Sequence, residues 1–135
     1  MQKVIEIEEG RSMNFKASAF SPIAYNRLFP GNDFLKDMNN LKEAHDVEQD
    51  SFTMEDYEHF VRIAYTFAYQ GLAPTPRETQ EQKEFREQYP DAWDWIDSFG
   101  TFSIYEILPE IIDLWYKNER TVSKGKNRVP APPAK

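Results

Sequence analysis

Apolar and polar residues alternate in two short segments on either side of Glu9-Gly10. A period of two is typical of a half-buried β-strand, and a glycine-containing pair between two such segments favours a tight turn. The sequence therefore predicts an antiparallel hairpin over residues 3–17, with Glu8 opposite Arg11 beside the turn. We expect one face of this hairpin to pack on helices, because an isolated hairpin is marginal in water. The residues of that face are Ile5, Ile7, Met13 and Phe15.

From residue 21 onward the apolar residues recur every three or four positions, which is the period of a helix packed on one side. Ser21-Pro22 predicts a helix start with Ser21 as the cap, and Pro30-Gly31 predicts the end of that helix. A second helix is expected after a cap at Asn32. Its predicted apolar stripe consists of Phe34, Leu35, Met38 and Leu41.

The polar and acidic stretch 45–51 is expected to be an exposed loop before a third helix. Thr53 can cap this helix, and Asp56 stands three residues later, which is the spacing of a reciprocal capping box. Apolar residues then occupy much of the helix circumference until Gly71, where the helix is expected to end. This helix is therefore either central to the fold or part of a binding surface.

Residues 78–88 form a strongly polar helical pattern with Phe85 as the only apolar member, so this helix is expected at the periphery. Asp91 can cap a further short helix that contains two of the three tryptophans. This helix is expected to end at Gly100.

The segment from Trp93 to Trp115 holds the densest apolar run of the chain and is expected at the centre of the core. Ser103 and Glu106 have the spacing of a capping box for the last helix. Pro109 interrupts that helical pattern, because proline removes one backbone donor and clashes with the preceding turn. We expect a kink there, or a helix that begins near Leu108.

These elements predict a mainly α-helical fold with a small N-terminal β-hairpin, an α+β arrangement with about five to six short helices. A chain of 135 residues is long enough to bury one core. We expect a single domain over residues 1–117, with the hairpin in 3–17 and the helices in 21–117. Residues 118–135 are basic, contain proline and have little to bury, so a disordered tail is expected there.

Charge is distributed unevenly along the chain. Residues 117–135 hold six of the 16 basic residues and one of the 23 acidic ones, so they carry +5 while residues 1–116 carry −12. An acidic body repels phosphate backbones, and the basic tail lacks interleaved aromatics for base stacking, which disfavours nucleic acid as a partner. No stretch approaches the roughly 18 apolar residues of a membrane span. We expect a cytosolic protein.

Catalytic and metal-binding patterns are not evident. The absence of cysteine excludes disulfides, thiolate nucleophiles and cysteine-based zinc sites. Asp91, Asp94 and Asp97 recur every third residue, but a solvated helix face explains them better than a cation site. His45 and His59 stand in acidic surroundings where an acid–base or metal site is conceivable. We expect neither an enzyme nor a cofactor.

Aromatic residues are abundant, with ten Phe, seven Tyr and three Trp. Amphipathic aromatics are preferred anchors of protein interfaces, so a subset is expected to line a groove for an apolar helix. For each of them a place in the core is the alternative. The candidate partner-binding residues are Tyr25, Phe29, Tyr65, Tyr69, Trp95 and Trp115.

Two long strings resemble a known protein family. The N-terminal string, IEIEEGRSMNFKASAFSPIAYNRLFPGNDFLKDM from Ile5 to Met38, is similar to the opening of the tail assembly chaperones of long-tailed phages and prophages of Gram-positive bacteria. The C-terminal string, WDWIDSFGTFSIYEILPEIIDLWYKN from Trp93 to Asn118, resembles that family's W-x-x-x-F…F-S-I-Y-E-x-L-P-E-I-x-x-L-W ending. This chain departs from the pattern at Pro30 and in the charged stretch 72–89.

The resemblance implies a non-enzymatic protein of the bacterial host cytoplasm. Such chaperones bind the long, aggregation-prone tape measure protein before tail tube subunits polymerise around it, so the tape measure protein is the expected partner and the major tail tube protein a second candidate. The family is often made in a short form and in a longer form produced by programmed frameshifting. A structural or head–tail connector protein of the virion is the alternative, and a small enzyme of unknown type is a third.

Overall fold

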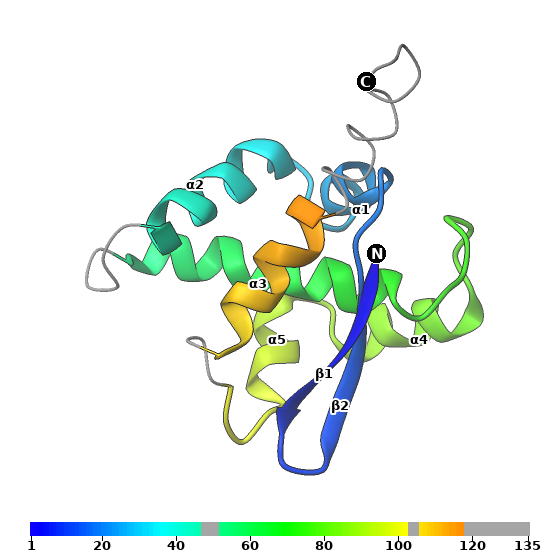
Figure 1. The fold of residues 1–135 in the computed structure, drawn as a ribbon. Coiled ribbons are helices and arrows are strands. Elements are labelled where there is room, and N and C mark those ends of the chain that lie inside the picture. Colours follow the sequence, from blue (N-terminus) through cyan, green and yellow to red (C-terminus); the bar gives the residue numbers. More distant parts are fainter. Residues whose placement is uncertain (47–51, 103–105, 118–135) are drawn as a thin grey trace, which may run out of the picture.

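A central helix organises the fold (Figure 1). The computed structural model describes residues 1–46, 52–102 and 106–117. Helix α3 (Met54–Gln70) contacts β2, α1, α2, α4 and α5. Its N-terminus is held by the predicted capping box: Asp56 N–H donates to Thr53 Oγ1, and Thr53 N–H donates to Asp56 Oδ2. Side chains around most of its circumference are buried, so a central place in the fold, one of the two alternatives that the sequence left open, is the one observed.

The hairpin consists of β1 (Gln2–Glu8) and β2 (Arg11–Lys16), which pair antiparallel with Glu8 opposite Arg11 as predicted. Gly10 adopts a φ of 79° in the turn, a region that glycine enters without steric cost. Of the predicted packing face, Ile5, Ile7 and Phe15 are buried and Met13 is half-buried. The hairpin therefore packs on the helices through the expected side.

Helix α1 (Ser21–Leu28) begins where predicted, but its cap is different. Phe20 occupies the N-cap position with no side-chain cap, and the Ser21 hydroxyl instead bonds within the protein interior. The cap of α2 (Phe34–Asp46) is also corrected, because Asp33 and not Asn32 accepts the N–H groups of Leu35 and Lys36. Each cap position therefore lies one residue from the predicted one. In α2 the side chain of Asp33, next to the predicted cap, supplies the acceptor.

The stripe of α2 differs from the prediction at one position. Phe34, Met38 and Leu41 are buried, but Leu35 is 57% exposed. Asp37 takes the fourth buried position of this helix. The helix therefore presents a carboxylate to the interior where the apolar pattern predicted only hydrocarbon.

Helices α4 (Gln80–Gln88) and α5 (Ala92–Asp97) follow along the chain. Helix α4 has its own capping box between Thr79 and Gln82, and it buries Phe85. Helix α5 is capped by Asp91, as predicted. It places Trp95 in the core with no exposed surface, surrounded by the rings of Phe15, Tyr65, Phe99 and Phe102.

The last described segment, residues 106–117, is helical and is the orange helix of Figure 1. Helical backbone is already present before Pro109, at Glu106 and Ile107. The Trp115 and Phe34 ring centroids lie 4.9 Å apart, which joins the helix to α2. The predicted cap at Ser103, part of the loop 45–51 and the predicted tail 118–135 lie outside the described residues.

The α+β prediction is confirmed: a two-stranded antiparallel hairpin precedes a set of short helices around one core. Among the described residues, none of the helices has the length and apolar character needed to cross a membrane.

Candidate functional site

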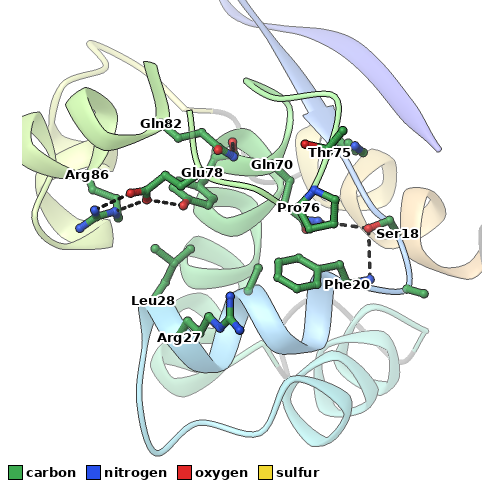
Figure 2. Close-up of a pocket in the computed structure, with 14 residues that line it drawn as sticks. Ser18, Phe20, Arg27, Leu28, Gln70, Thr75, Pro76, Glu78, Gln82 and Arg86 are labelled. Carbon is green, nitrogen blue, oxygen red and sulfur yellow. Dashed lines mark hydrogen bonds and ion pairs between the residues drawn. The ribbon is translucent and has the colours of Figure 1, made fainter. Parts of the chain in front are cut away.

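A groove of about 640 Å³ lies between α1, the C-terminal end of α3, the connection 72–79 and α4 (Figure 2). This volume is within the roughly 300–1,000 Å³ of typical ligand pockets. The groove is assembled from segments that are far apart in the sequence, because α3 brings the end of the hairpin, α1 and α4 to one side of the molecule.

One wall of the groove is apolar. It comes from α1 and the turn before it and presents Ala19, Phe20, Ala24 and Leu28. Pro76 lines the groove from the connection before α4. The guanidinium of Arg27 lies 5.4 Å from the centroid of the Phe20 ring, within cation–π range.

A small hydrogen-bond network links α3 to the start of α1 beside the groove, and Figure 2 shows its contact between Gln70 and Ser18. The Ser21 hydroxyl donates to Gln70 Oε1 at 2.6 Å, and Gln70 Nε2 donates to Ser18 Oγ at 3.2 Å. The Ser18 N–H in turn donates to Ser21 Oγ at 3.0 Å. Each side chain of the network therefore has a partner within the protein, as buried polar groups require.

The opposite wall carries a charged network, the rim triad, formed by Tyr69, Glu78 and Arg86. Arg86 binds the Glu78 carboxylate through Nε (2.6 Å) and Nη2 (2.9 Å), and the Tyr69 hydroxyl donates to Glu78 Oε2. The hydrogen bonds from Arg86 and then Tyr69 lower the pKa of Glu78 from 4.5 to about 2. Burial, followed by the hydrogen bond to Glu78, raises the pKa of Tyr69 to about 12.

The charge of the lining is opposite to that of the acidic body. Lys16, Arg27 and Arg86 line the groove, with Glu78 as the one carboxylate in the lining. Glu78 is neutralised by Arg86. Lys16 donates to the carbonyls of Ala73 and Pro74 (3.3 and 3.2 Å). Within the described residues, no carboxylate lies within 4 Å of Lys16 or Arg27, so neither positive charge is paired with an acidic side chain.

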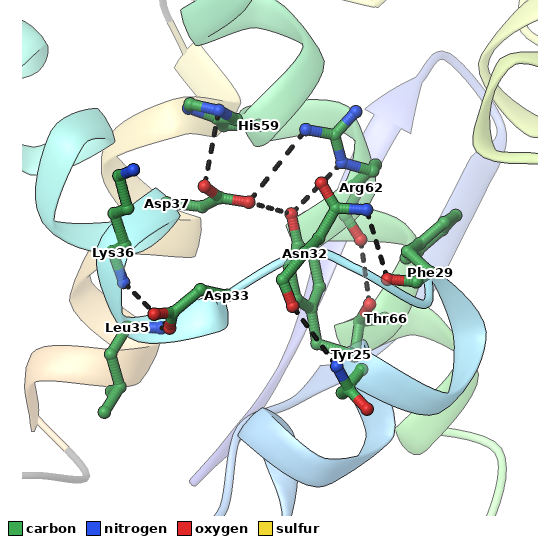
Figure 3. Close-up of polar contacts among 11 residues, drawn as sticks. Tyr25, Phe29, Asn32, Asp33, Leu35, Lys36, Asp37, His59, Arg62 and Thr66 are labelled. Carbon is green, nitrogen blue, oxygen red and sulfur yellow. Dashed lines mark hydrogen bonds and ion pairs between the residues drawn. The ribbon is translucent and has the colours of Figure 1, made fainter.

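A second charged network, the core tetrad, is buried between α1, α2 and α3 (Figure 3). It contains Tyr25, Asp37, His59 and Arg62. The Tyr25 hydroxyl donates to Asp37 Oδ2 at 2.7 Å, and Arg62 Nε donates to the Tyr25 oxygen at 3.1 Å. His59 Nε2 lies 3.4 Å from Asp37 Oδ1, and Arg62 Nη2 lies 3.9 Å from Asp37 Oδ2.

The core tetrad joins three helices and faces the interior. Asp37 and His59 are 7% and 6% exposed, and no described pocket opens onto them. Burial raises the pKa of Tyr25 well above its usual value of 10.0, and the hydrogen bond from Arg62 lowers it in part. His59, which the sequence placed only in acidic surroundings, therefore lies inside the protein. His45 is exposed in the last turn of α2.

The aspartates of the α5 region serve local structure. Asp91 accepts the Trp93 N–H at 2.7 Å, while Asp94 and Asp97 are exposed. In the described part of the chain, no three or more His, Asp or Glu side chains converge in a way that could hold a metal ion.

The predicted partner-binding residues divide into two groups. Tyr25, Tyr65, Trp95 and Trp115 are buried in the core, so the expectation that they line a surface groove is corrected. Their rings fill space between helices, which is the alternative that the sequence left open. Phe29 is half-buried against Tyr25 and Tyr65. Tyr69 does line the groove.

Sequence patterns did not point to the other groove residues. Phe20 falls between the hairpin and α1, and Glu78 and Arg86 belong to a polar stretch predicted only to be peripheral. Glu78 precedes α4 and Arg86 lies within it, eight residues later. The two side chains meet only because the connection before α4 folds back on this helix. Arg27, a lone cation on an apolar helix, was the one available signal.

Comparison with known proteins found no matching family model, no similar curated protein and no similar solved structure. The candidate site therefore rests on its own geometry.

Proposed function

We propose that this protein is a tail assembly chaperone of a long-tailed phage or prophage, which binds the tape measure protein and keeps it soluble before the tail tube forms. The observation that carries the proposal is the resemblance of the strings Ile5–Met38 and Trp93–Asn118 to that family. The proposed place of action is the cytoplasm of the bacterial host, and the tail tube protein is a second proposed partner.

The packing of the two strings against one another supports this proposal. Arg11 donates to the Ser98 carbonyl at 2.9 Å and lies over the Phe99 ring at 3.9 Å. Glu8 Oε1 accepts the N–H groups of Gly100 and Thr101. Residues of the hairpin turn thus hold the segment after α5, so the two family-like strings form one structural unit rather than two separate motifs.

The physical character of the molecule is compatible with transient shielding of an apolar client. An acidic exterior disfavours self-association, and an apolar groove with a charged rim can bind a client segment without a deep hydrophobic interface. Moderate affinity suits this role, because the client must later pass to the tail tube.

Co-expression tests the proposal directly. The tape measure protein encoded near this gene is expected to be largely insoluble alone and to become soluble when this chain is co-expressed, with the two proteins co-purifying. A matched control co-expresses an unrelated acidic helical protein of similar size. Absence of both a complex and a gain in solubility would count decisively against the chaperone role.

Purified virions separate the chaperone from a structural or connector protein. A chaperone leaves before the tail is complete, so mass spectrometry of purified tails should not detect this chain. Its presence at a fixed copy number would favour the connector alternative. A tape measure gene downstream and a slippery heptamer near the stop codon are the expected genomic context.

A further inference from the structure

We infer that the groove between α1, α3 and α4 docks a client segment in which an acidic side chain stands beside apolar ones. The inference rests on the proposed function and assigns the client site to this groove. The occupant is a short amphipathic segment of the tape measure protein, recognised through a carboxylate and neighbouring apolar side chains.

Charge complementarity is the first argument. Residues 1–116 carry −12, yet the groove lining holds Lys16, Arg27 and Arg86 against Glu78 alone. Arg86 is occupied by Glu78 through two hydrogen bonds, which leaves Lys16 and Arg27 as the uncompensated charges. Arginine presents a fork of donors that matches a carboxylate, so Arg27 is suited to receive an acidic side chain.

The apolar wall is the second argument. Phe20 and Leu28 are only half-buried and Ala19 is exposed, so hydrocarbon is available along the same side of the groove as Arg27 (Figure 2). A ligand that carries only charge would leave this apolar wall exposed to solvent. A segment with apolar side chains on either side of its carboxylate would cover it, which is the recognition mode of a peptide or helix in a groove.

The polar groups beside the groove and at its rim provide the third argument. Gln70 and Ser21 bond to one another, and the side chain of Gln82 accepts the Thr79 N–H and donates to the Tyr69 carbonyl. These groups are already satisfied and hold the walls in place. Specificity therefore falls to the apolar wall and to Lys16 and Arg27, the two lining cations without a carboxylate partner in the described residues.

The chain's own basic segment is disfavoured as the occupant. Residues 118–135 contain five basic residues and one acidic residue, so they would meet the cationic lining with like charge. An acidic client segment satisfies the charge requirement that this segment does not.

Three variants test the docking site. Arg27→Glu reverses an exposed cation in the groove, and Ala19→Trp places an indole in the groove from an exposed position. Lys36→Glu is the matched control, because Lys36 is an exposed helical cation outside the groove. Thermal unfolding of each variant verifies that it is folded.

The probe is a set of overlapping peptides that span the tape measure protein encoded near this gene, with binding measured by fluorescence anisotropy. The peptides that bind are expected to contain Asp or Glu within one helical turn of apolar residues. Arg27→Glu should weaken their binding by about threefold or more, on the scale of an exposed ion pair converted to repulsion. Ala19→Trp should abolish binding, and Lys36→Glu should leave it within about twofold of wild type.

The outcomes separate this inference from the function on which it rests. If wild type binds and solubilises the client while Arg27→Glu and Ala19→Trp do the same, the groove is not the client site and the chaperone function stands. If the binding peptides are basic, the recognition chemistry is overturned. If wild type neither binds nor solubilises the client, both proposals fall. Self-association that Arg27→Glu abolishes, seen by sedimentation, would assign the groove to a second copy and overturn the inference.

Discussion

The core tetrad and the rim triad contain the same three chemical groups in different surroundings. In each, a tyrosine hydroxyl donates to a carboxylate that an arginine also contacts: Tyr25, Asp37 and Arg62 in the core, and Tyr69, Glu78 and Arg86 at the groove. The Asp37 side chain is 10% exposed and that of Glu78 is 35% exposed. The two networks therefore share these three groups and differ in access to water, and the core tetrad has His59 as an additional member.

Access to water gives the two networks different roles. A charge that is buried and then left unpaired is strongly destabilising, whereas an exposed ion pair contributes little because water solvates either partner alone. The core tetrad is expected to hold α1, α2 and α3 in register. The rim triad is expected to shape the groove wall while contributing little to the free energy of unfolding.

Removing the buried carboxylate is expected to have the largest effect. Asp37→Ala leaves the Tyr25 hydroxyl, His59 and Arg62 without their shared acceptor. The free energy of unfolding should fall by about 3–5 kcal/mol, the usual cost of breaking a buried charge pair. Urea denaturation followed by circular dichroism measures this loss.

The control for Asp37→Ala is Glu43→Ala, at an exposed position of the same helix. This variant is expected to stay within about 0.5 kcal/mol of wild type. If the two variants lose equal free energies of unfolding, burial does not make the Asp37 carboxylate more important for stability than an exposed carboxylate.

Removing the exposed carboxylate is expected to have a smaller effect that depends on pH. Because the pKa of Glu78 is lowered to about 2, its stabilising contribution is present above its ordinary pKa of 4.5 and is lost as pH falls from there through about 2. At neutral pH, Glu78→Gln should lower the free energy of unfolding by at most about 1 kcal/mol. The difference between wild type and variant should shrink on acidification, as measured by urea denaturation at stepped pH.

The comparison between the two networks is contradicted if Glu78→Gln lowers the free energy of unfolding as much as Asp37→Ala does. Nuclear magnetic resonance titration of the Glu78 carboxyl in an Arg86→Met variant gives a more direct measurement. Its pKa should rise towards 4.5, since Arg86 is the main cause of the depression.

The tyrosines are expected to show the smallest and most local effect. Burial raises the pKa of Tyr69 to about 12 and that of Tyr25 still higher, so both contribute stability that is full below 10.0 and is lost as pH rises through the folded-state pKa. Glu78→Gln should lower the pKa of Tyr69 alone, because Glu78 faces only that hydroxyl. Tyrosinate absorbance, compared with a Tyr69→Phe variant, measures this shift.

Local patterns in the sequence predicted the elements well. Alternation identified the hairpin and its buried face, and the Thr53–Asp56 spacing identified the start of α3. Each of these patterns spans only a few residues. Over that length the backbone and the side chains of the segment itself determine its geometry. The caps of α1 and α2 were misplaced by one residue for different reasons. In α2 the adjacent polar residue Asp33 accepts the backbone N–H groups in place of Asn32, and in α1 the Ser21 hydroxyl donates to Gln70 in the interior, so Phe20 occupies the N-cap position without a side-chain cap.

The sequence by itself determined that this chain forms a hairpin and several short helices with an acidic body, and it carried the resemblance to tail assembly chaperones. Only the tertiary structure decided which aromatic residues are core, since Tyr65 and Tyr69 lie on one helix four residues apart and yet only Tyr69 lines the groove. It also decided that Asp37 is buried and that Arg86 meets Glu78. Burial and long-range pairing depend on how separate helices pack, and a local pattern carries no information about the element that will cover it.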